Sequence, residues 1–136
     1  MKKSALACAL LSIGAWTAGA SAQPQPVTVT LVGDQIRADP DRVIVERRMG
    51  SNVVIHWRLP PGADYRFDPT GIVVNGEQTP GGLRPQDQLP NSCPSASPKQ
   101  VTCINRNTRS GTFKYTIRLL DRDQRPIVLD PLIVNQ

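Results

Sequence analysis

The sequence has few of the residues that most often carry chemistry. Its 136 residues include a single histidine, His56, together with three cysteines and two methionines. A multi-histidine metal centre needs several imidazoles, and a hydrolytic nucleophile needs an oriented base, so either site would have to be built around His56 alone. The Gly-x-Ser-x-Gly segment that exposes a nucleophilic serine is also missing. We therefore expect no enzymatic activity.

Aromatic residues are scarce as well, at 4% of the chain. Proteins that bind single-stranded nucleic acid stack bases on aromatic side chains and collect basic residues in one groove. Here, once Lys2 and Lys3 are set aside, 14 basic residues remain against 11 acidic ones, and they are scattered along the sequence. We expect no nucleic-acid partner.

The first 22 residues have the organisation of a secretory signal peptide. Lys2 and Lys3 precede an apolar run over residues 5–18, and residues 20–22 (Ala-Ser-Ala) form a small-x-small cleavage site. The apolar run is shorter than the about 20 residues that a membrane span needs, so we expect no transmembrane segment after cleavage. Cleavage after Ala22 would leave 114 residues in the periplasm or outside the cell.

Two cysteines remain after this cleavage, Cys93 and Cys103. An even pair in an oxidising compartment predicts a disulfide bond. A metal-binding dithiol would need further ligands nearby, and the only histidine is His56.

The rest of the chain, residues 23–136, reads as a single β domain. No stretch has helical periodicity, and short β-rich runs are separated by Gly, Pro and Asp. The predicted strands cover residues 27–32, 42–47, 52–59, 71–75, 100–105, 112–120 and 127–134. About seven such strands are typical of an all-β, Greek-key sandwich.

Two of these strands alternate strictly between apolar and polar residues. This period of two predicts strands with one buried face. The residues expected in the core are Val53, Ile55, Trp57, Phe113, Tyr115, Ile117 and Leu119.

Residues 76–99 interrupt the pattern with five prolines and three glycines, which predicts a long surface loop tied down by Cys93. Binding residues concentrate on loops of a rigid scaffold, so the candidates for recognition are Leu83, Arg84, Asp87 and Leu89. The alternative is a tolerated insertion without a role.

Two aspartate pairs, Asp39 with Asp41 and Asp121 with Asp123, carry oxygens that suit calcium. Both pairs lie where turns are needed, and Asp favours turns by bonding to nearby backbone amides. We expect them to stabilise turns.

The chain resembles the cupredoxins, and more closely the small secreted bacterial proteins that share this scaffold without copper ligands. Residues 50–55 (Gly-Ser-Asn-Val-Val-Ile) match an early strand of the family, and residues 111–117 (Gly-Thr-Phe-Lys-Tyr-Thr-Ile) match the strand that delivers the copper thiolate. The resemblance implies a cupredoxin-like sandwich. It also places Ile117 at the thiolate position and residues 65–67 where the first histidine ligand belongs, so no cofactor is expected.

Two functions remain open from the sequence. The first is a non-catalytic binding module whose partner is an unidentified protein of the cell envelope or its surroundings. The second is a small periplasmic copper-binding protein that uses His56 and Met49, since imidazole and thioether both suit copper.

Overall fold

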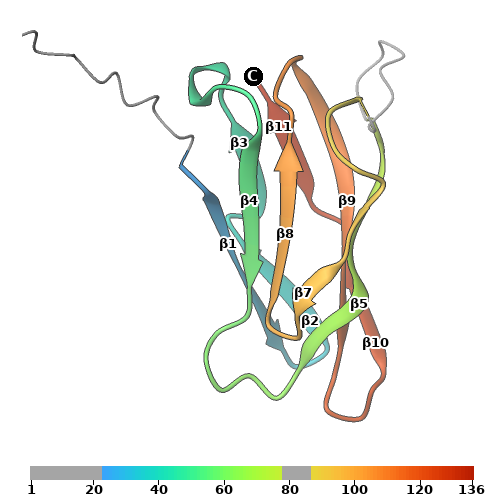
Figure 1. The fold of residues 1–136 in the computed structure, drawn as a ribbon. Coiled ribbons are helices and arrows are strands. Elements are labelled where there is room, and N and C mark those ends of the chain that lie inside the picture. The colour runs from blue at the N-terminus through green and yellow to red at the C-terminus, as the bar shows by residue number, and fades with distance from the viewer. Residues whose placement is uncertain (1–22, 78–86) are drawn as a thin grey trace, which may run out of the picture.

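A computed structural model describes residues 23–77 and 87–136, which form a sandwich of two β-sheets (Figure 1). The predicted all-β sandwich is confirmed. Runs rich in Val, Ile and Thr form the strands, and Gly, Pro and Asp lie in the turns between them. In the described part of the chain, no helix is long and apolar enough to cross a membrane.

Sheet A contains five strands in the order β2–β1–β4–β8–β7. Their bounds are β1 (Gln25–Val32), β2 (Gln35–Asp39), β4 (Val53–Arg58), β7 (Ser95–Ser97) and β8 (Gln100–Asn105). β1 and β4 run parallel, and the other neighbours are antiparallel.

Sheet B contains six strands in the order β3–β11–β9–β5–β6, and β10 also pairs with β9. Their bounds are β3 (Arg42–Val45), β5 (Arg66–Glu77), β6 (Ser92–Cys93), β9 (Gly111–Leu120), β10 (Pro126–Leu129) and β11 (Leu132–Asn135). The 3-10 turn η1 (Arg47–Met49) leads from β3 in sheet B to β4 in sheet A.

One hydrophobic core fills the space between the two sheets. All seven residues predicted from the alternating strands are fully buried there, so the predicted facing of both strands is confirmed. Trp57 from sheet A and Tyr115, Phe67 and Phe113 from sheet B are the largest of the buried side chains.

Each of the seven predicted strands corresponds to a strand of the structure, and the sandwich contains more strands than predicted. β2 was not predicted because Ile36 is its only large apolar residue, as befits a strand at the edge of a sheet. Gly33 and Asp34 between β1 and β2 carried the missed signal, because a Gly-Asp pair between two short runs is typical of a tight hairpin.

The segment 76–99 differs from the expected long loop. β5 extends to Glu77, and residues 87–99 contain β6 and β7, which join opposite sheets. The predicted strand over 127–134 is divided at Asp130 and Pro131 into β10 and β11.

Candidate functional site

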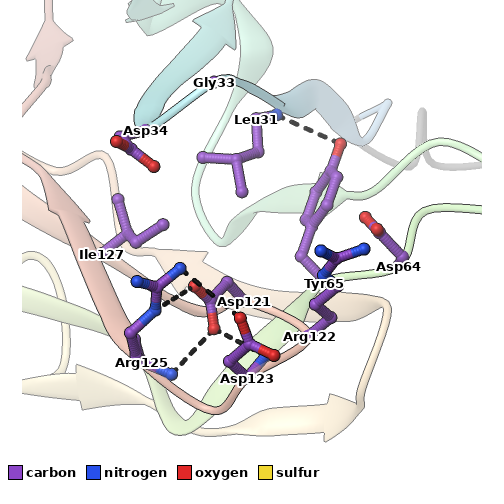
Figure 2. A pocket seen from close by; sticks show the side chains of 10 residues that line it. All are labelled: Leu31, Gly33, Asp34, Asp64, Tyr65, Asp121, Arg122, Asp123, Arg125 and Ile127. Carbon is purple, nitrogen blue, oxygen red and sulfur yellow. Dashed lines mark hydrogen bonds and ion pairs between the residues drawn. The ribbon is translucent and has the colours of Figure 1, made fainter.

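Three connections converge at one end of the sandwich and line a depression of about 370 Å3, called here the end depression (Figures 1 and 2). They are the β1–β2 turn, the segment between β4 and β5, and the β9–β10 turn. The lining residues are Leu31, Gly33, Asp34, Asp64, Tyr65, Asp121, Arg122, Asp123, Arg125 and Ile127.

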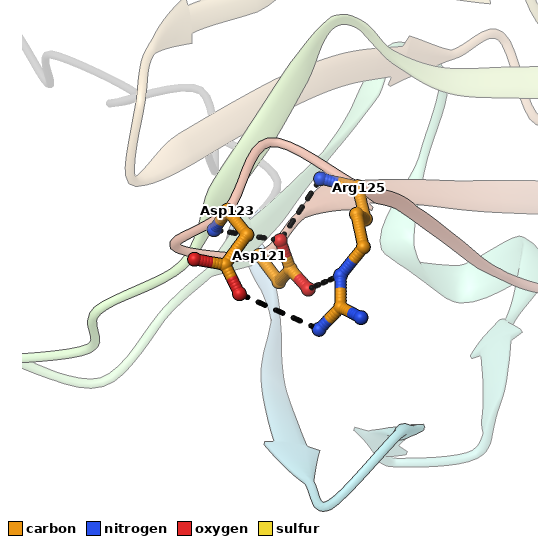
Figure 3. Close-up of polar contacts among 3 residues, drawn as sticks. All are labelled: Asp121, Asp123 and Arg125. Carbon is orange, nitrogen blue, oxygen red and sulfur yellow. Dashed lines mark hydrogen bonds and ion pairs between the residues drawn. The ribbon is translucent and has the colours of Figure 1, made fainter.

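The β9–β10 turn is organised by the carboxylate of Asp121 (Figure 3). Its Oδ1 accepts the backbone N–H groups of Asp123 at 2.8 Å and Arg125 at 2.9 Å, and its Oδ2 accepts Nε of Arg125 at 2.9 Å. These bonds, with the Arg125 backbone N–H contributing most, hold the pKa of Asp121 below its usual value. The predicted turn-stabilising role of this aspartate pair is thus confirmed.

Arg125 also reaches Asp123, with Nη2 3.6 Å from Oδ2. The hydrogen bond and charge of Asp121 raise the pKa of Arg125, and Asp123 and Asp34 add to this effect. Two carboxylates and one guanidinium therefore form a fixed group on one side of the end depression (Figure 3).

Tyr65 supports the opposite wall. Its ring is buried, and its hydroxyl oxygen accepts the backbone N–H of Leu31 at 3.1 Å, which links the β4–β5 segment to β1 (Figure 2). Lys99 also holds the β4–β5 segment, because its Nζ donates to the carbonyl oxygens of Ala63 at 2.5 Å and Tyr65 at 2.6 Å. The wall is therefore fixed by the backbone of β1 in sheet A and by a side chain from the β7–β8 connection.

Other charged groups in the end depression have no fixed partner. Asp34, Asp64 and Arg122 make no hydrogen bond or ion pair with any residue that the structure describes. Since Asp121 and Asp123 are engaged by Arg125, the charge available to a ligand comes from Asp64, Arg122 and Asp34, the last of which interacts with Arg125 only through its charge. Leu31 and Ile127, both packed against the core, supply an apolar floor.

A second depression of about 410 Å3 adjoins the first along the side of the sandwich. It shares Asp34, Asp121, Arg125 and Ile127 with the end depression and extends to Val128 of β10. Concave surface therefore continues from the end of the sandwich along the beginning of β10.

The predicted disulfide between Cys93 and Cys103 is present, with 5.5 Å between the two Cα atoms. Cys93 lies on β6 of sheet B and Cys103 on β8 of sheet A, and both are buried. The bond therefore joins the two sheets across one side of the core.

The four candidate recognition residues of the segment 76–99 do not form one surface in the described structure. Leu83 and Arg84 lie outside the described residues. Asp87 is half-buried, and Leu89 is only 1% exposed and packs in the core. Leu89 is a core residue because β6 and the disulfide draw this part of the segment onto the sandwich. It is therefore not available on the surface to a partner.

The two residues of the alternative copper site lie on different sides of sheet A. His56 occupies the outer face of β4, where its Nδ1 is 2.9 Å from Oγ1 of Thr102. Met49 belongs to η1 and packs against the core. Across residues 23–77 and 87–136, no group of three or more His, Cys, Asp or Glu side chains is arranged to hold a metal ion.

The sequence analysis missed Asp34, Asp64, Tyr65 and Arg125 as members of one site. Each looks locally like a turn or core residue, and only the order of the strands brings them together. Tyr65, which lies where the resemblance places the first histidine ligand, contributes a phenol to the end depression, and the β9–β10 turn contributes carboxylates and guanidinium groups. None of the known protein-family models matches this chain, and no curated protein is significantly similar to it.

Proposed function

We propose that this chain is exported, cleaved after Ala22, and acts as a non-catalytic, cupredoxin-like binding module in the periplasm or outside the cell. The export signal in residues 1–22 and the disulfide between Cys93 and Cys103 support this location, since disulfide bonds persist in oxidising compartments. The partner is a protein that the end depression recognises.

The observation that carries this proposal is the contrast between fixed and unpaired charges in the end depression. Arg125, Asp121 and Asp123 hold one another in the turn, whereas Asp34, Asp64 and Arg122 make no hydrogen bond or ion pair beside them, and Asp34 interacts with Arg125 through its charge alone. A rigid base with available charges lowers the entropy lost on binding, because the site needs little ordering. Two available carboxylates against one guanidinium favour a partner that presents a basic side chain.

The electrostatics of the end depression support binding over catalysis. General acid–base catalysis near neutral pH is favoured by a carboxyl group whose pKa is raised toward the working pH. Hydrogen bonds lower the pKa of Asp121, which keeps this group ionised. An ionised carboxylate held by backbone amides is suited to positioning and charge recognition.

The first test is export. We expect the intact mass of the exported protein to correspond to a chain that begins at Gln23, and a mass that retains residues 1–22 would contradict the proposed cleavage.

The second test is capture of partners from envelope and culture extracts, followed by binding measurements with the purified partner. We expect Asp34→Asn combined with Asp64→Asn to weaken binding at least tenfold, and we expect high salt to weaken wild-type binding as well. The matched control combines Ser51→Lys with Ser110→Lys, which makes the same change in net charge at exposed positions of the β3–β4 and β8–β9 connections, and these connections lie at the opposite end of the sandwich. Equal binding by all three proteins would exclude the end depression as the recognition site.

A further inference from the structure

β10 and β11 follow one another along the same side of β9 without a change of register. Pro126 lies opposite Leu120 at one end, and Asn135 lies opposite Gly111 at the other. The parallel strand β3 covers the far edge of β11 from Leu132 to Asn135, but the pairing does not extend to β10. Sheet B therefore has an edge that is paired along β11 and unpaired along β10, which β2 approaches without forming a ladder.

The direction of the backbone groups of β10 follows from three hydrogen bonds. Asp121 N–H donates to the Arg125 carbonyl oxygen at 3.0 Å, and Tyr115 N–H donates to that of Pro131 at 3.1 Å. In an antiparallel ladder, bonded pairs alternate with non-bonded pairs, so the odd-numbered residues from 125 to 131 face β9. On the outer edge, Gln136 N–H donates to the Val45 carbonyl oxygen of β3 at 3.0 Å, as this alternation requires.

Val128 consequently directs both its N–H and its carbonyl group away from β9, and Pro126 directs its carbonyl group the same way. Within residues 23–77 and 87–136, no backbone hydrogen bond joins β10 to β2, the strand of sheet A that lies nearest to this edge. Val128 is 56% exposed, which is unusual for a large apolar residue in this protein. An exposed strand edge with unpaired N–H and carbonyl groups is a template for another strand.

The surroundings of this edge indicate what kind of strand it accepts. The second depression runs beside Pro126, Ile127 and Val128 and continues to Asp34, whose carboxylate makes no hydrogen bond or ion pair in the described structure and interacts with Arg125 through its charge alone. Pro126 supplies a carbonyl acceptor but no N–H donor, so an added strand gains the N–H of Val128 and the carbonyl groups of Val128 and Pro126. A short extended segment with a basic side chain satisfies both the backbone groups and the carboxylate.

We propose that an extended, lysine- or arginine-bearing segment of the partner protein adds to the free edge of β10 and places its basic side chain against Asp34. This inference rests on the proposed binding function and specifies the partner's conformation. Main-chain hydrogen bonds supply affinity in this mode of recognition, and side chains on alternate positions supply specificity. The carboxylate of Asp34 selects the charge of the added segment, and Val128 determines where the segment lies.

The experiment uses the exported protein labelled with 15N and a blocked peptide, Thr-Val-Lys-Val-Thr, as the probe. We expect saturable changes in the amide resonances of Val128 and its neighbours, and slower hydrogen exchange of the Val128 amide when the peptide is bound. Methylating the backbone nitrogens of the central Lys and the residues beside it removes donors without changing the protein, and we expect this to weaken binding at least tenfold. Replacing Lys by Glu in the peptide should weaken binding by a similar factor.

Three results would overturn the inference. The first is binding of the N-methylated peptide within twofold of the unmodified peptide, and the second is a set of resonance changes confined to β3, β6 or β7. The third is absence of binding by the unmodified peptide at millimolar concentration. A mixed result is also informative: the double variant Asp34→Asn with Asp64→Asn no longer binds the natural partner, but N-methylation does not change the affinity of the peptide. That result would retain the end depression as the binding site and exclude strand addition.

Discussion

The indole of Trp57 and the phenol of Tyr115 meet in the middle of the core and join the two sheets. Nε1–H of Trp57 donates to the hydroxyl oxygen of Tyr115 at 3.2 Å, and the ring centroids lie 5.4 Å apart with the planes tilted by 59°. Trp57 comes from β4 of sheet A and Tyr115 from β9 of sheet B. The pair satisfies a buried polar group on each residue while it fills the centre of the core.

Removing the indole of Trp57 should therefore lower the stability of the fold far more than removing the imidazole of His56, its neighbour on the outer face of the same strand. We expect Trp57→Ala to lower the free energy of unfolding by about 3–5 kcal/mol, because a large cavity forms and a hydrogen bond is lost. We expect His56→Ala, the matched control on β4, to cost on the order of 0.5 kcal/mol. Urea unfolding of both variants measures these values, and similar losses would contradict the facing of β4.

Alkaline pH should weaken the fold through Tyr115. Burial raises the pKa of this phenol to about 12, the Trp57 hydrogen bond opposes that effect, and the charge of Asp41 adds to it. Because the pKa is higher in the folded state, the contribution to stability is complete below about pH 10 and is lost as the pH rises toward 12. Absorbance at the phenolate band, measured for wild type and Tyr115→Phe, identifies this ionisation. Ionisation of Tyr115 at pH 10 in the folded protein would contradict the prediction.

The disulfide should contribute substantially to stability because it joins the two sheets. Cys93 and Cys103 close a short loop, and we expect the double variant Cys93→Ala with Cys103→Ala to lose about 3 kcal/mol of unfolding free energy on the chain-entropy account. Peptide mapping without reductant should recover the crosslinked pair from the exported protein. Two thiols that react readily with an alkylating reagent in the native protein would contradict the bond.

Gly71 should tolerate substitution much less well than Gly62, although both have a positive φ. A Cβ at Gly71 would lie 2.8 Å from the carbonyl oxygen of Cys93 and 2.8 Å from Cγ2 of Val101, whereas a Cβ at Gly62 meets nothing within 4 Å. We expect Gly62→Ala to cost about 1–2 kcal/mol from backbone strain alone. Gly71→Ala should cost about 2–5 kcal/mol, since overpacking adds to that strain. Thermal unfolding of the two variants measures these losses. Equal decreases of the melting temperature would contradict the predicted difference between Gly71 and Gly62.

Copper should not produce an intense blue colour with this protein. Ile117, the residue at the thiolate position in the family that the sequence resembles, is buried in the core, and both described cysteines are in the disulfide. A blue-copper centre requires a thiolate together with two imidazoles. Addition of cupric ions, with and without reductant, should give no strong visible charge-transfer band. A strong band would reopen electron transfer as the function.

The sequence by itself determined which side of the regular strands faces the core. The alternation at Val53, Ile55 and Trp57 predicts their burial because side chains in a strand point to opposite faces in turn. The disulfide was also within reach of the sequence, since Cys93 and Cys103 are the only pair after the signal peptide. These inferences depend on local periodicity or on counting residues.

The tertiary structure decided which residues share a site and which apolar residues are buried. Asp34, Asp64 and Asp121 look like ordinary turn residues. They lie together only because β1, β4 and β9 end at the same end of the sandwich. Leu89 sits among prolines and polar residues, yet β6 and the disulfide pull it into the core. The unpaired edge of β10 likewise depends on where the short strand β3 begins, since Arg42 lies opposite Leu132. These features arise from contacts between residues far apart in the sequence, for which irregular turns and short edge strands carry no periodic signal.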